Sequence, residues 1–176
     1  MKHPSFDYVL AGLLLSAALA LPVFFHLLGL GSAFMPMFYP LALAGFLVAT
    51  PLAMVVGVSA PLLSALFTGM PPFYPPIAFI MMAEGLLFTG VPRPLQNFFK
   101  LPDWLALLFV LLLDRVLLFV LVQAMADLME LPPRLLGWAA VVRGLPGLSL
   151  MLAILPWIIS LMRAGKERLA RRHEQE

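Results

Sequence analysis

The sequence predicts an all-α membrane protein with six transmembrane helices and both termini on the cytoplasmic side. Its 176 residues are 62% hydrophobic and 11% charged, whereas roughly 25% of the residues in a soluble domain are charged. The apolar runs are continuous and lack the alternation of polar and apolar residues that a membrane-spanning strand shows. A run such as 105–122 is long enough to cross a hydrocarbon core of about 30 Å as a helix.

Glycine, proline and charged residues divide the chain, which we interpret as one integral membrane domain over 1–176, into six apolar segments. The first follows Lys2 and has no small-residue cleavage site, so we expect it to be retained. A charge-free stretch comes next and is divided at Pro51, because proline suits a first helical turn and disfavours helix in the residue before it. The proline-rich segment 69–76, the basic segment 93–100 and the charged segment 127–134 separate the remaining helices. The expected spans are 7–28, 34–49, 51–68, 74–89, 102–127 and 134–162.

The distribution of basic residues supports six spans rather than five. With six spans and both termini inside, cytoplasmic segments contain eight of the eleven basic residues, namely Lys2, Arg93, Lys100, Arg163, Lys166, Arg168, Arg171 and Arg172. This matches the enrichment of Lys and Arg in cytoplasmic loops. Merging the second and third spans would place Arg93 and Lys100 on the face opposite the amino terminus. We interpret the basic tail, 163–176, as a solvated cytoplasmic flank, with a lipid-binding or partner-binding helix as the alternative.

Four charged residues lie inside the expected spans: Glu84, Asp114, Arg115 and Arg143. An ionisable side chain at the bilayer centre costs at least about 2.5 kcal/mol, so such residues need partners or a function. At a rise of 1.5 Å per residue, all four lie roughly 13 to 20 Å below the outer surface, where they can meet with a net charge of zero. They form either an ion-pair network that locks the last three helices together or the polar floor of a ligand pocket open to the outside.

The chemistry of the four groups suggests ligand-binding roles. A guanidinium group binds a carboxylate or phosphate through two parallel hydrogen bonds, so Arg115 and Arg143 are candidates for binding an anionic group. Glu84 would accept an amine or ring N–H of a ligand, or neutralise Arg115. Asp114 completes the candidate cluster.

The three expected outer loops, 29–37, 69–76 and 127–134, would cover such a pocket. The first two are uncharged and rich in methionine, proline and aromatic residues, which is typical of an apolar lid. We therefore add His26, Met37, Tyr74 and Trp138 to the candidate ligand-binding residues. The alternative for each is packing at the membrane interface, where aromatic residues are common.

Small residues at intervals of four mark two of the expected helices. Gly12, Ser16 and Ala20 form one such stripe, and Ala49, Ala53 and Gly57 form another. Small residues let another helix come close in lipid. Each stripe serves either packing within the chain or docking of a separate membrane subunit.

Motifs for catalysis or nucleotide binding are missing from the sequence. Gly165-Lys166 is followed by glutamate and lacks the leading glycine of a phosphate-binding loop, and Gly57-Val58-Ser59 does not continue as a nucleophile elbow. Cysteine is absent, which excludes thiolate metal sites. We expect no catalytic residues, no metal site, no cofactor and no nucleic-acid partner, and any ATP-driven transport would need a separate ATPase.

Several segments, in their order along the chain, resemble the S components of energy-coupling factor (ECF) transporters. They are 25–31 (FHLLGLG), 35–37 (MPM), 44–46 (AGF), 61–64 (PLLS) and 68–72 (TGMPP). The resemblance is close in the first half of the chain and rests on length and topology in the second. One departure is the stripe on the first helix, where the family pattern is Ala-x-x-x-Ala. Another is Ala49-Thr50-Pro51, where Gly-Pro is expected.

The resemblance implies a six-helix bundle in the prokaryotic cytoplasmic (inner) membrane, surrounded by lipid, that captures a vitamin or related micronutrient at the outer face. It also implies a transmembrane T component and two ATPase subunits as partners, with Gly12, Ser16 and Ala20 meeting the T component. The mixed charges of the candidate pocket favour a polar ligand with an anionic group and a flat or apolar part.

Two other functions fit the same residues. An autonomous channel or proton-coupled carrier would use Glu84, Asp114 and Arg115 as a relay, because charges in a helix bundle often mark ion pathways. A non-transporting membrane scaffold or assembly factor would use the same charges as a structural lock.

Overall fold

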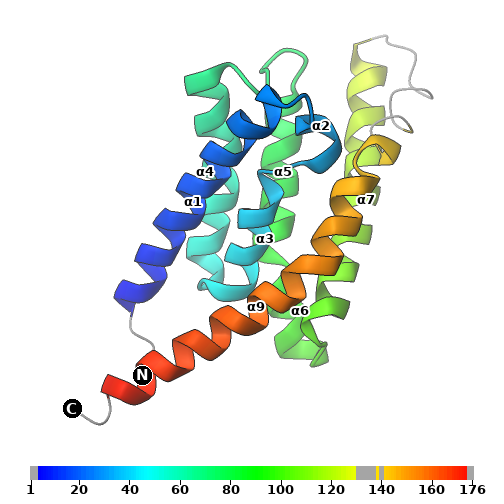
Figure 1. Ribbon diagram of the computed structural model, residues 1–176. Helices are drawn as coiled ribbons and strands as arrows, with labels where there is room; N and C mark the ends of the chain where they lie inside the picture. The colour runs from blue at the N-terminus through cyan, green and yellow to red at the C-terminus, as the bar shows by residue number, and fades with distance from the viewer. Residues whose placement is uncertain (1–3, 130–137, 139–140, 174–176) are drawn as a thin grey trace.

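All regular structure in the described part of the chain is helical (Figure 1). The structure is a computed structural model that describes residues 4–129, 138 and 141–173. Four of its helices are long and apolar enough to cross a membrane. They are α1 (Pro4–Leu27), α4 (Thr50–Thr68), α7 (Asp103–Leu128) and α9 (Leu145–His173). The chain is therefore an all-α membrane protein, as the composition predicts.

Two further apolar helices are shorter and lie inside the bundle. At 1.5 Å per residue, the 10 residues of α3 (Phe38–Leu47) and the 14 of α5 (Ile77–Gly90) extend about 15 and 21 Å. Eight residues of α3 are buried, because α1, α4, α5 and α9 surround it. Among the described residues, four apolar helices are thus of spanning length and two are shorter, so six full-length spans are not confirmed.

The start of the second expected span differs from the prediction. Phe34 ends a separate one-turn helix, α2 (Gly31–Phe34), and Met35 then adopts a left-handed conformation with φ of 47°. This turn interrupts an apolar stretch that composition alone makes continuous, so the expected helix over 34–49 begins at Phe38 instead. The break before Pro51 is confirmed, since Val48 is extended and α4 begins at Thr50.

Successive apolar helices run in alternate directions through the bundle. α1, α4 and α7 run one way and α3, α5 and α9 return, so the start of α1 and the end of α9 lie at the same end (Figure 1). We call it the charged end. Arg163 on α9 forms an ion pair of 2.7 Å with Asp103 at the start of α7, and the α6 (Pro92–Phe99) residue Arg93 donates to the Leu47 carbonyl over 3.1 Å. The pKa of Arg93 is lowered, and the largest cause is burial of its side chain. The charge of Asp7 raises this pKa, and the charge of Arg163 lowers it.

The two small-residue stripes behave differently. α4 and α5 cross so closely that a Cβ atom added at Gly85 would lie 2.1 Å from the Gly57 carbonyl oxygen. The stripe ending at Gly57 is therefore used for packing inside the chain. Gly12, Ser16 and Ala20 on α1 are exposed instead, and nothing lies within 4 Å of a Cβ added at Gly12.

The last expected span can be assessed in part. Residues 134–137 and 139–140 lie outside the described residues, and the described helix α9 begins at Leu145. α9 continues to His173, so the basic tail begins as an extension of this helix rather than as a separate segment.

Candidate functional site

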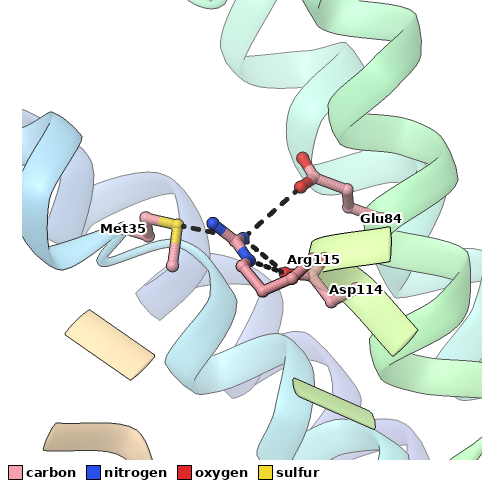
Figure 2. Close-up of polar contacts among 4 residues, drawn as sticks. All are labelled: Met35, Glu84, Asp114 and Arg115. Carbon is pink, nitrogen blue, oxygen red and sulfur yellow. Dashed lines mark hydrogen bonds and ion pairs between the residues drawn. The ribbon is translucent and has the colours of Figure 1, made fainter. Parts of the chain in front are cut away.

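Three of the four intramembrane charges meet between α5 and α7 (Figure 2). The Arg115 Nε donates to Asp114 Oδ2 over 3.0 Å, and Nη2 contacts the same oxygen. Nη2 also lies 3.8 Å from Glu84 Oε1, which is an ion pair longer than a hydrogen bond. Glu84 comes from α5 and its two partners from α7, so the cluster ties these helices together.

The cluster is almost fully removed from solvent. The exposed fractions of the side chains are 4% for Glu84, 0% for Asp114 and 10% for Arg115. Two buried polar atoms, Asp114 Oδ1 and Arg115 Nη1, have no hydrogen-bond partner within the described ranges. With both carboxylates ionised, one guanidinium faces two negative charges and the cluster carries a formal charge of −1.

Met35 and Gly144 lie against the Arg115 guanidinium, and the sequence predicted neither as part of the cluster. Nη2 donates to Met35 Sδ over 3.6 Å (Figure 2). A Cβ added at Gly144 would lie 2.7 Å from Nη1 and 3.0 Å from Met35 Sδ. A side chain at position 144, where the chain enters α9, would therefore have to displace the ends of the Arg115 and Met35 side chains. In the sequence, the available signal for this contact was a glycine, Gly144, directly after Arg143 inside an expected span.

Arg143 does not join the other three charges, contrary to expectation. It is exposed, whereas its neighbour Gly144 is buried against Arg115. Gly144 forms a turn between the helical residues 141–143 and α9, so the two adjacent residues face different surroundings. With Gly144 against the cluster, Arg143 points elsewhere, and the expected net charge of zero becomes −1.

A cavity of about 670 Å³ opens at the end of the bundle opposite the charged end. The ends of α1 and α4, the turn around α2, the segment 70–72 and α5 enclose it. Of the candidate ligand-binding residues, His26, Met37 and Glu84 line it together, and among the described lining residues Glu84 is the charged one. Its size suits a small molecule, since ligand pockets measure roughly 300 to 1,000 Å³.

The rest of the described lining is mainly apolar and contains four methionines, namely Met35, Met37, Met70 and Met81. The segment carrying Met70 is anchored, because the Ser64 hydroxyl donates to the Met70 carbonyl over 2.6 Å. The segments 29–37 and 69–76, which the sequence predicts as an apolar lid, therefore border this cavity.

Tyr74 and Trp138 lie away from this cavity. Tyr74 is 82% exposed and lines a separate groove between α5 and α7. Trp138 is 62% exposed and packs against Phe119, with 5.4 Å between ring centroids. Of the alternatives for these two aromatics, packing at the membrane interface fits their positions better than ligand contact.

The described ranges contain no group of three His, Cys, Asp or Glu side chains placed to hold a metal ion. No protein-family model, no curated protein and no solved structure matches the chain. The geometry offers a mainly apolar cavity of the size of a small molecule, with one carboxylate, that of Glu84, in its described lining.

Proposed function

We propose that this chain is the substrate-binding subunit of an importer of the ECF type. The observation that supports it is the cavity of about 670 Å³, which four of the five segments resembling that family help to line and Glu84 reaches. In this proposal a vitamin or related micronutrient enters from the outer face, and the charged end faces the cytoplasm. The proposed location is the inner membrane of a prokaryote.

The proposal includes six passes through the membrane with both termini inside. The alternating helix directions support this topology, as does the gathering of Arg93 and Arg163 at one end. The short helices α3 and α5 would cross as part of the bundle, because α1, α4, α5 and α9 pack around α3, and α3, α4 and α7 pack on α5.

The proposed partners are a transmembrane T component and two ATPases. The exposed stripe of Gly12, Ser16 and Ala20 on α1 supports a close helix contact there, since small residues let two helices approach in lipid. Replacing Ser16 with a bulky residue such as tryptophan should prevent assembly while ligand binding by the isolated chain persists.

The direct test is mass spectrometry of small molecules released from the chain purified in mild detergent. The proposal predicts one stoichiometric compound, lost in Glu84→Ala and retained in Arg143→Ala, which is the matched control because that arginine lies outside the cluster. An empty wild-type protein, with no ATP-dependent uptake when partner subunits are supplied, would refute the proposal and favour a structural role for the charges.

One observation favours a second function, a proton-coupled carrier. The formal charge of −1 at the cluster is a charge that a proton would neutralise, as in a proton relay. Proteoliposomes containing this chain alone distinguish the two functions. A carrier moves substrate under a proton gradient, whereas a binding subunit shows no flux without its partners and ATP.

A further inference from the structure

We infer that the small molecule held in the cavity carries a positive charge, as a protonated amine or another cationic nitrogen, and that Glu84 recognises it. This inference rests on the proposed function and names the class of substrate. It reverses the expectation of an anionic ligand, which depended on two arginines in the site.

The charge balance of the described cluster is the first argument. Glu84, Asp114 and Arg115 sum to −1, and Arg143, which was expected to complete the balance, is exposed elsewhere. His26 in the cavity lining is counted as neutral. A buried charge is stable in a low-dielectric environment when it is paired. With both carboxylates ionised, one positive charge is missing; a proton supplies it in the empty site, and a ligand cation takes the place of that proton when the site is filled.

The positions of the two carboxylates show which of them a positively charged ligand would contact. Asp114 makes the closer contacts with Arg115, through Nε and Nη2, whereas Glu84 has the single ion pair of 3.8 Å. Of the two, Glu84 lines the cavity and Asp114 does not. The less neutralised carboxylate is thus the one that a ligand can reach.

The arginine is poorly placed for an anionic ligand. Arg115 is absent from the described lining, and Gly144 and Met35 cover its guanidinium. An anion entering the cavity would meet the carboxylate of Glu84 first and be repelled. The geometry therefore disfavours a negatively charged ligand and favours a positively charged one.

The apolar part of the cavity lining indicates the polarity and size of the rest of the ligand. Four methionines and the segment 70–72 present an apolar surface. Methionine is flexible, and its sulfur makes favourable contacts with aromatic rings. The substrate class is a cation attached to a flat or apolar body that fits within about 670 Å³.

The experiment uses three probes of similar shape and different charge: 2-phenylethylamine, 3-phenylpropanol and 3-phenylpropionate. Calorimetric titration of the full chain in detergent should give the tightest binding for the amine, by about tenfold or more over the alcohol, and the weakest for the carboxylate. Glu84→Gln keeps the shape of the side chain and removes its charge, so it should abolish the preference for the amine. Arg143→Ala should preserve that preference.

Equal binding of the three probes, or tightest binding of the carboxylate, would overturn the inference and leave a ligand-binding function in place. If no probe binds, the compound released from the purified wild-type chain decides: a cation supports the inference, and a neutral or anionic compound refutes it. A chain that binds no probe and releases no compound would refute the proposed function together with the inference.

Discussion

The crossing of α4 and α5 provides a sharp test of the structure, through the substitution Gly85→Ala. The added methyl group would lie 2.1 Å from the Gly57 carbonyl oxygen, whereas carbon and oxygen normally approach to about 3.3 Å. The two helices must therefore separate by roughly 1.2 Å. The obstacle is backbone, so no side-chain rotation relieves it.

The expected energy follows from two opposing effects. Overpacking a close contact costs about 1 to 3 kcal/mol, and a backbone obstacle places this site near the upper value. Alanine returns up to about 1 kcal/mol through its higher helix propensity. The net loss of stability is about 2 kcal/mol, which corresponds to a decrease in melting temperature of roughly 4 to 8 °C for a chain of this size.

Thermal unfolding in detergent, followed by circular dichroism, measures this effect. Gly12→Ala is the matched control, because nothing lies within 4 Å of the added Cβ, and it should melt at or slightly above the wild-type temperature. Since Gly85 adjoins Glu84, the first variant should also retain less ligand. A Gly85→Ala protein that melts within about 1 °C of the wild type would refute the close crossing.

Four other substitutions test the cluster and the orientation. Gly144→Ala should destabilise the protein by about 1 kcal/mol, the lower end of the overpacking range, because its methyl group displaces the ends of the Arg115 and Met35 side chains rather than backbone; an unchanged melting temperature would contradict that packing. Arg115→Met leaves two buried carboxylates without their guanidinium and should cost about 3 to 5 kcal/mol in thermal unfolding, whereas a loss below about 1 kcal/mol would show that the ion pairs contribute little. The chain has no cysteine, so Tyr74→Cys and Lys100→Cys introduce unique exposed thiols at opposite ends of the bundle. A membrane-impermeant maleimide applied to intact cells should label the first and not the second, and the reverse pattern would invert the topology.

The sequence by itself determined the class of protein, the order of its longer apolar helices and the break before Pro51, but not the short helices α2 and α6. These follow from local physical chemistry: continuous apolar runs need helical backbone in lipid, and proline disfavours helix in the residue before it. It also identified Glu84, Asp114 and Arg115, because charges inside apolar helices need partners.

Tertiary packing decided what local chemistry leaves open. The rise per residue gives the depth of a side chain along a helix, but its direction depends on how the helix is rotated against its neighbours. Arg143 is therefore exposed away from the cluster, while adjacent Gly144 faces it. The left-handed turn at Met35 likewise depends on packing, since Met35 Sδ accepts a hydrogen bond from Arg115, 80 residues further along the chain. The excess negative charge at the cavity floor results from that packing, and so does the inference of a cationic substrate.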